Sequence, residues 1–150
     1  MDHSKKAEEL FLSGYNCAQA VFCAFCDLTG LEVELAARLS SSFGGGLARL
    51  REVCGAVSGM AMTLGYLYGY GDPGATDEKK EHYARVRGLV EKFSAECGHY
   101  ICRELLGEGG KDSSPVPEKR TEAYYKKRPC AKLCAVAAQL IDDYISEVGL

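Results

Sequence analysis

The chain has 150 residues, which is enough for one domain with its own core and without disulfide or metal staples. Its formal net charge of -3 comes from basic and acidic residues spread along the sequence, which excludes a basic stripe for nucleic acid or an anionic membrane surface. Its 8 cysteines exceed ordinary usage but fall short of a secreted disulfide scaffold. Because the amino terminus lacks an apolar signal core, we expect a cytoplasmic protein whose cysteines are ligands or redox thiols.

Every patterned segment has helical spacing, and none alternates as a strand does. The pattern predicts an all-α fold, a single-domain bundle of about five to seven helices over residues 1–150. Caps, glycines and prolines place the helices at residues 4–12, 17–28, 31–39, up to 70 for a glycine-rich central helix, 76–97, 100–106, and from 129 onward.

The second predicted helix carries two separate sets of cysteines. Cys17 shares one face with small apolar residues, whereas Cys23 and Cys26 lie on roughly the opposite side. Because this Cys-x-x-Cys lies inside a helix and is followed by Asp27 instead of histidine, neither a thioredoxin-like motif nor a haem attachment is expected. The helix is apolar on nearly every side, which suits either a symmetric homodimer contact or a central position in the fold.

The central helix is uncharged from Val53 to Tyr70, a length that just reaches a membrane span. Polar residues and many glycines make the run only mildly apolar, so we expect a buried helix of a soluble domain and no membrane span. Since internal glycines weaken a helix, Gly55, Gly59 and Gly65 imply that another backbone packs close to Cys54.

Two loops are distinctive. The three consecutive glycines at 44–46 lack the lysine and the preceding strand of a phosphate-binding loop. Residues 108–118 form the one long loop, rich in glycine, serine and proline, and are the candidate for a segment that moves or covers a site.

Cys17, Cys130 and Cys54 lie at or near the amino end of their predicted helices. Backbone N–H groups and the helix dipole can lower a cysteine pKa there from about 8.5 to roughly 3.5–7.5. Cys102 lacks that position, but the Gly-His-Tyr-Ile segment before it could direct it inward. Together the four cysteines form a candidate set of convergent thiolates.

Five short motifs resemble the C_GCAxxG_C_C family of redox-active proteins over about residues 8–145. They are GYNCAQAV at 14–21, FGGG at 43–46, CGAVSG at 54–59, CRELLG at 102–107 and CAKLCAVAA at 130–138. The resemblance places the family's four cysteines on Cys17, Cys54, Cys102 and Cys130, although the order Cys-Gly-Ala at 54–56 departs from the family's Gly-Cys-Ala. The family is similar to a cysteine-bearing domain of some multihaem cytochromes, which implies iron and sulfur. The additional cysteines are expected in the core; they are Cys23, Cys26, Cys97 and Cys134.

Three chemistries suit these four cysteines as the site. The first hypothesis is a [2Fe-2S] centre in a small electron carrier or sensor, with a redox partner that the sequence does not identify. The second is a structural zinc site with four cysteine ligands, although such sites usually use closely spaced Cys-x-x-Cys pairs. The third is a metal-free dithiol, with Cys17 or Cys130 as attacker and Cys54 as its partner. His99, near Cys102 in the sequence, is the one histidine kept as a neighbour of the site.

Overall fold

The structure is a computed structural model that describes residues 2–150. It confirms the all-α class: within these residues there are nine α-helices, two short 3-10 helices and no strand, apart from one antiparallel bridge between Val53 and Ile101. The helices are α1 His3–Leu12, α2 Cys17–Ala24, α3 Cys26–Thr29, α4 Val33–Ser40, α5 Gly55–Tyr68, α6 Thr76–Cys97, α7 Cys102–Leu106, α8 Glu122–Lys127 and α9 Cys130–Val148; the 3-10 helices are η1 Ser41–Phe43 and η2 Gly107–Gly110.

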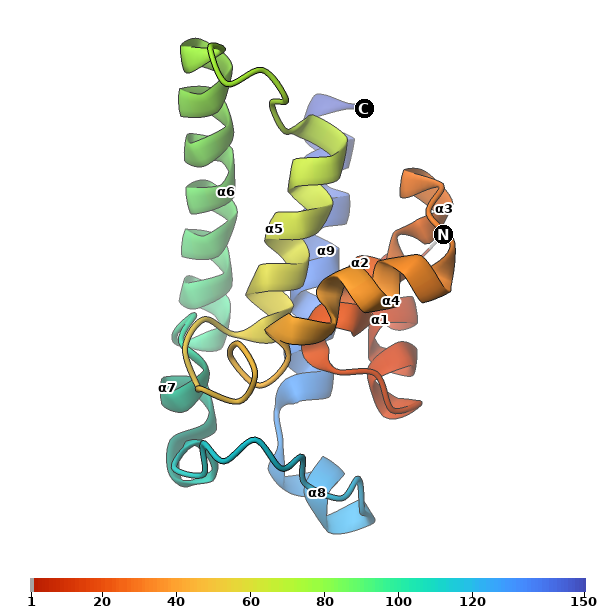
Figure 1. Cartoon of the computed structure of the whole chain (residues 1–150), viewed down its shortest axis with the longest axis vertical. Coiled ribbons are helices and arrows are strands. Elements are labelled where there is room, and N and C mark those ends of the chain that lie inside the picture. Colours follow the sequence, from red (N-terminus) through yellow and green to blue (C-terminus); the bar gives the residue numbers. More distant parts are fainter. Residues whose placement is uncertain (1) are drawn as a thin grey trace.

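Helix α2 lies at the centre of the fold and packs against α1, α4, α5 and α9 (Figure 1). Every residue of α2 except Gln19 is buried. A capping box starts the helix, in which the Asn16 side chain accepts from the Gln19 N–H and the Gln19 side chain accepts from the Asn16 N–H. The chain itself therefore covers α2, and this helix has no exposed apolar face for a dimer contact.

Helix α5 packs its glycines directly on α2. A Cβ added at Gly59 would lie 2.7 Å from the Ala18 carbonyl oxygen, and one added at Gly55 would lie 3.0 Å from the Cys17 Cβ. The backbone that was expected to pack close to these glycines is therefore that of α2. The prediction was wrong for Gly65, whose Cβ position has no neighbour within 4 Å.

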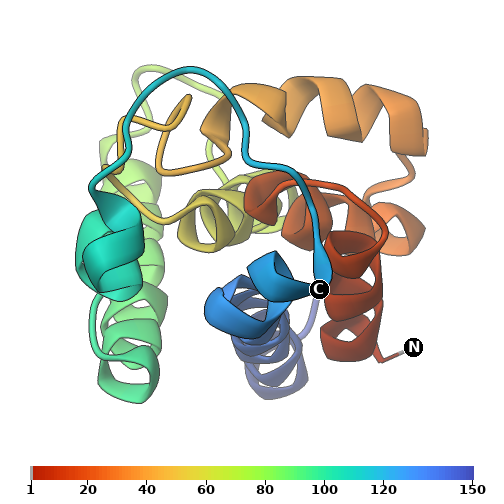
Figure 2. The same ribbon diagram turned by 90° about the horizontal axis from the view of Figure 1, so that it is seen from below.

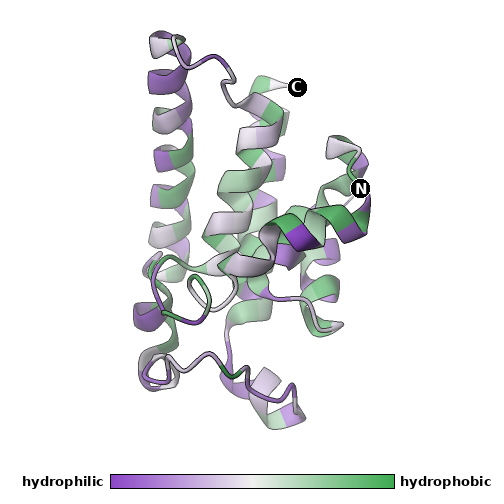
Figure 3. Cartoon of the chain, viewed as in Figure 1, coloured by the Kyte–Doolittle hydropathy of each residue, from purple (hydrophilic) through white to green (hydrophobic). Residues whose placement is uncertain are grey.

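Helix α6 stands at the edge of the bundle beside α5 and α9 (Figure 1). It is the most hydrophilic long helix, with purple turns along most of its length in Figure 3, and it buries only His82, Leu89 and Phe93. None of the helices formed by residues 2–150 is both long and apolar enough to cross a membrane.

The helix count exceeds the prediction mainly because the second predicted helix is broken. Phe25, with φ -102° and ψ 16°, separates α2 from α3. Its side chain is fully buried and stacks on the His3 ring, with 4.1 Å between ring centroids. This contact with the first helix is tertiary, so local helical spacing could not indicate it. Helix α8 was also not predicted.

Candidate functional site

All four predicted cysteines line one cavity of about 320 Å³. Each comes from a different helix: Cys17 is the first residue of α2, Cys54 is the N-cap of α5, and Cys130 is the first residue of α9. Cys102 is the first residue of α7, a position that the sequence analysis did not assign to it. The cavity therefore lies where the amino ends of four helices meet, with their positive dipole ends directed toward it.

A short backbone pairing brings Cys54 and Cys102 together. The Cys54 N–H donates to the Tyr100 carbonyl at 2.8 Å, and the Cys102 N–H donates to the Glu52 carbonyl at 2.6 Å. Residues 51–54 thus run antiparallel to residues 100–103, although the two segments lie far apart in the sequence. This pairing fixes the starts of α5 and α7 next to each other.

On the opposite wall, α2 meets α9 through thiols. The Cys134 Sγ donates to the Cys17 carbonyl at 3.7 Å, and the thiols of Cys17, Cys130 and Cys134 are near enough to shift one another's pKa values. Cys134 is fully buried, as expected of a core residue, but it also contacts a predicted site residue. The signal for this was present in the sequence, because Cys130 and Cys134 lie four residues apart and share a helix face.

The loop after the three glycines follows a left-handed path along the cavity. Five consecutive residues, 45 to 49, have positive φ, and so does Arg51. A non-glycine residue in this region costs about 1–2 kcal/mol, so the surrounding contacts must hold the loop in place. The N–H groups of Arg51 and Glu52 donate to the carbonyls of Gly45 and Gly46 at 3.1 and 2.8 Å.

Gly46 is required at its position. A Cβ there would lie 2.7 Å from both the Cys102 Cβ and the Glu52 nitrogen. Its φ of +73° is also one that L side chains rarely adopt. The glycine loop therefore brings its backbone against Cys102.

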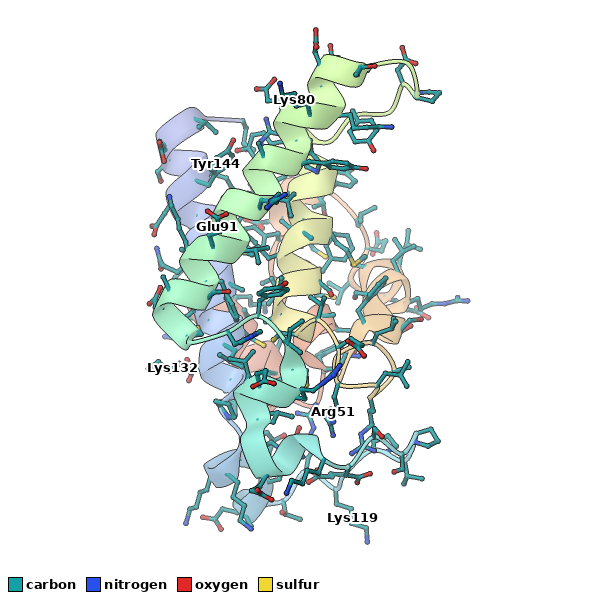
Figure 4. All side chains as sticks on the ribbon, turned by 90° about the vertical axis from the view of Figure 1, so that its left-hand side faces the viewer. Arg51, Lys80, Glu91, Lys119, Lys132 and Tyr144 are labelled. Carbon is teal, nitrogen blue, oxygen red and sulfur yellow. The ribbon has the colours of Figure 1, made fainter. Side chains whose placement is uncertain are left out.

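Four arginines line the cavity with the cysteines, and the sequence analysis missed them. They are Arg49, Arg51, Arg120 and Arg128. Figure 4 shows Arg51 beside the start of α7. The basic residues are spread along the sequence, and this hid the cluster. The Arg-x-Arg spacing of Arg49 and Arg51, shortly after the glycine loop, was the available signal.

Two of these arginines are neutralised by carboxylates and two are not. Arg49 pairs with Asp112 and Glu118, and Arg128 pairs with Glu118. In the part of the chain that the structure describes, neither Arg51 nor Arg120 forms an ion pair with a carboxylate. The cavity is therefore electropositive.

Arg120 is held by rings and carbonyls. Its guanidinium lies 4.3 Å from the Phe11 ring centroid and 5.1 Å from that of Tyr124, and it donates to the carbonyls of Phe11 and Tyr15 at 3.1 Å each. These contacts orient the cation but do not cancel its charge. An anionic group in the cavity would do so.

The predicted long loop covers the cavity. Residues 111–121 arch from η2 over the glycine loop to α8, as the cyan segment in Figure 2 shows. Arg49 donates to the carbonyls of Ser114 and Val116, and Arg51 Nε donates to the Asp112 carbonyl at 2.9 Å. Pro115 and Pro117 lie in the cavity wall. The arginines thus tie this segment, which we call the strap, over the cysteines.

The expectation of lowered cysteine pKa values was wrong for the thiols as they stand in this fold. The pKa of Cys17 is raised well above its ordinary value: its hydrogen bond with Cys130 lowers it, but the bond with Cys134, burial and the neighbouring thiols outweigh that effect. Burial raises the pKa of Cys54 to about 12, against the opposing effect of the Ala56 and Val57 N–H groups. Helix amino ends do not overcome desolvation here.

The pKa values of the other two cavity thiols are raised as well. The pKa of Cys130 is raised by its hydrogen bond with Cys17 and by burial. Burial also raises the pKa of Cys102, although the Arg51 guanidinium opposes it. All four cysteines are therefore protonated thiols at neutral pH. They lose these protons only when they bind a metal cation or are oxidised.

The remaining candidates lie outside the cavity lining. Cys23, Cys26 and Cys97 do not line it, and neither does His99. The His99 Nδ1 instead accepts from the N–H groups of Tyr100 and Ile101 at 2.9 and 3.0 Å, which shapes the turn before Cys102. Over residues 2–150, no three side chains of histidine, cysteine, aspartate or glutamate are placed to hold one metal ion.

The order of cysteines and the glycine loop correspond to a known family model. The model described as "Putative redox-active protein (C_GCAxxG_C_C)" matches residues 15–144, which include every cavity cysteine. The chain belongs to this family. The family description indicates redox activity and names no cofactor. No curated protein and no solved structure matches the chain.

Proposed function

We propose that this member of the C_GCAxxG_C_C family is a one-electron carrier or sensor with a [2Fe-2S] centre held by Cys17, Cys54, Cys102 and Cys130. The observation that carries the proposal is that four cysteines from four helices line one electropositive cavity. Such a centre, when bound, supplies reversible transfer of a single electron. The cysteines hold it, and the rest of the cavity sets its electrostatic environment.

The arrangement of the donors supports a two-iron centre better than a single zinc ion. A tetrahedral zinc site needs all four sulfurs about 2.3 Å from one ion. In this cavity, backbone pairing joins the segments of Cys54 and Cys102, while Cys17 and Cys130 are the first residues of the packed helices α2 and α9. Two pairs suit a centre that distributes four cysteines over two irons.

The charges support the same proposal. A [2Fe-2S] centre with four thiolates is anionic in both oxidation states, and Arg51 and Arg120 have no carboxylate partner among residues 2–150. An anion in the cavity would compensate these two cations. Because the thiols have raised pKa values, loading must release their protons, so assembly is favoured by higher pH.

Metal and sulfide analysis of anaerobically purified protein tests the proposal. We expect two irons and two acid-labile sulfides per chain, with visible absorption between about 400 and 600 nm. Cys54→Ser and Cys102→Ser should each lose the iron and the colour, whereas Cys97→Ser, at a cysteine outside the cavity lining, should keep both. Circular dichroism checks that each variant is folded. Iron that survives both cavity substitutions, or one zinc per chain, would refute the proposal.

A metal-free dithiol is the second candidate, favoured by the contact between the Cys17 and Cys130 thiols. In that function Cys130 is the partner of Cys17, in place of the Cys54 expected from the sequence. The two thiols lose two electrons and two protons to form a disulfide, while a disulfide of another molecule is reduced to two thiols. A colourless protein that loses two thiols on mild oxidation, with the disulfide mapped to Cys17 and Cys130, would favour this function.

A further inference from the structure

A second pair of cysteines lies at the break between α2 and α3. Cys23 is in the last turn of α2, and Cys26 is the first residue of α3. In a continuous helix, residues three apart have Cβ atoms about 5–6 Å apart, whereas a disulfide needs roughly 3.5–4.5 Å. The backbone leaves the helix at Phe25, between the two cysteines. Cys23 and Cys26 therefore flank a helix break instead of lying in one continuous helix, although no strand precedes them as in a thioredoxin-like motif.

The two thiols interact with each other. The thiols of Cys23 and Cys26 are near enough to shift each other's pKa values, and Cys23 Sγ donates to the Val33 carbonyl at 3.8 Å. The hydroxyl of Thr29 is hydrogen-bonded to Cys26. The pair is thus held together by local contacts at the start of α3 and the loop before α4.

This pair is separate from the cavity. Cys23 packs with Phe22 and Ala36 in a small apolar cluster between α2 and α4, and Cys26 packs against that cluster. Cys17 belongs to the main core, and neither Cys23 nor Cys26 lines the cavity. Chemistry at the pair therefore does not require the four cavity cysteines.

The two sulfurs differ in exposure. Cys23 is only 3 % exposed, whereas Cys26 is partly open to solvent. This asymmetry is what stepwise thiol–disulfide exchange needs: an accessible cysteine that meets the oxidant and a sheltered one that resolves the mixed disulfide.

We propose that Cys23 and Cys26 form a second redox site, a dithiol that low-molecular-weight disulfides oxidise to an intramolecular disulfide. The Cys26 thiolate attacks one sulfur of the small disulfide, whose S–S bond breaks, and the leaving thiolate takes up a proton. Cys23 then gives up its proton, attacks the Cys26 sulfur and releases the second small thiol. The protein loses two electrons and two protons, and one disulfide becomes two thiols.

This site gives the chain two-electron thiol–disulfide chemistry. It does not depend on the proposed iron–sulfur centre. The pair responds to the thiol–disulfide balance around the protein, and its disulfide would fix the junction of α2 and α3.

Incubation of the full chain in glutathione redox buffers, followed by acid quenching, digestion and mass spectrometry, tests the proposal. We expect a disulfide between Cys23 and Cys26 that dithiothreitol reverses. Cys23→Ser should trap glutathione on Cys26, because the resolving thiol is gone. Cys97→Ser is the matched control, and Cys54→Ser separates this site from the cavity; both should still form the Cys23–Cys26 disulfide.

Three results would overturn the proposal. In the unsubstituted chain, Cys26 could carry glutathione without ever forming the intramolecular disulfide. Both cysteines could remain reduced in buffers that oxidise dithiothreitol. A disulfide through Cys26 could instead join two chains, which a non-reducing gel detects.

Discussion

The guanidinium of Arg51 touches the sulfur of Cys102: Nη1 lies 3.8 Å from Sγ, and Nε donates to the Asp112 carbonyl at 2.9 Å. Arg51 is only 6 % exposed and has no carboxylate partner among the described residues. One side chain therefore links a cavity cysteine to the strap that covers it, and places an uncompensated positive charge at the sulfur.

Replacing Arg51 should shift the redox potential of the proposed [2Fe-2S] centre. The buried cation favours the state with the extra electron, so Arg51→Gln should make the midpoint potential more negative by roughly 60 mV, a tenfold change for a one-electron couple. Potentiometric titration measures the shift. The control is Arg87→Gln, at an exposed arginine on α6. Equal potentials for the two variants would mean that Arg51 does not act on the centre.

Alanine substitutions at two glycines of α5 should change the free energy of unfolding in opposite directions. At Gly59 the new Cβ would lie 2.7 Å from the Ala18 carbonyl oxygen, so Gly59→Ala should lower the free energy of unfolding by about 1–3 kcal/mol. At Gly65 the position is open, so Gly65→Ala should raise it by up to about 1 kcal/mol through helix propensity. Urea unfolding compares the two, and a stable Gly59→Ala protein would contradict the packing of α5 on α2.

Alkaline pH should destabilise the reduced, metal-free protein. The pKa values of Cys23 and Cys54 are raised to about 12, whereas a thiol in the unfolded chain ionises near 8.5. Below about pH 8.5 both states keep these protons, and the stability is fully present. Above it, the unfolded state loses protons that the folded state retains, so the free energy of unfolding falls by up to about 1.4 kcal/mol per pH unit for each such thiol.

Urea midpoints at pH 7.5, 9 and 10.5 measure this loss. Cys23→Ala removes one of the raised thiols and should flatten the decline. Midpoints that are the same at all three pH values would show that the thiols are not protected in the fold.

His3 should stabilise the junction of α1, α3 and α9. Its Nδ1 lies 2.6 Å from Asp142 on α9 and its Nε2 lies 2.9 Å from Asp27 on α3, while the ring stacks on Phe25. Only the doubly protonated ring makes both hydrogen bonds. His3→Ala should lower the free energy of unfolding by about 2 kcal/mol, since both carboxylates are partly exposed and regain water.

Lys5→Ala is the control for this substitution, because Lys5 is exposed on the same helix. Chemical unfolding at neutral pH compares the two variants. Similar stabilities would show that the three-way contact contributes little.

Local signals in the sequence were sufficient for much of the fold. The helix from Thr76 to Cys97 was predicted close to its observed bounds, because an acidic first turn and Gly98 mark its ends, although the N-cap is Ala75 and not Thr76 or Asp77. The break at Phe25 was missed; the Phe25 ring stacks on His3, on a different helix, and such a tertiary contact leaves no local signal. The spacing of apolar residues indicates which face of a helix is buried, but it does not indicate which other element packs on that face.

The site shows the same division. Motif and helix position indicated the four cysteines. Spacing alone pointed to Cys134 and Arg51, but their contacts, and the place of Arg120 in the cavity, depend on how distant segments pack together. The direction of the thiol pKa values was also mispredicted, because helix position is local while burial of Cys54 depends on the whole fold. Sequence thus indicated the donors but not their electrostatic environment.

The number of electrons that the protein takes up tests whether the cavity cysteines hold a [2Fe-2S] centre. The protein, purified anaerobically, is reduced stepwise and followed by electron paramagnetic resonance, with Cys54→Ser alongside. We expect one paramagnetic centre per chain after uptake of one electron, and none in Cys54→Ser. Uptake of two electrons without any paramagnetic species, together with two new thiols at Cys17 and Cys130, would contradict a [2Fe-2S] centre and leave the dithiol as the redox group.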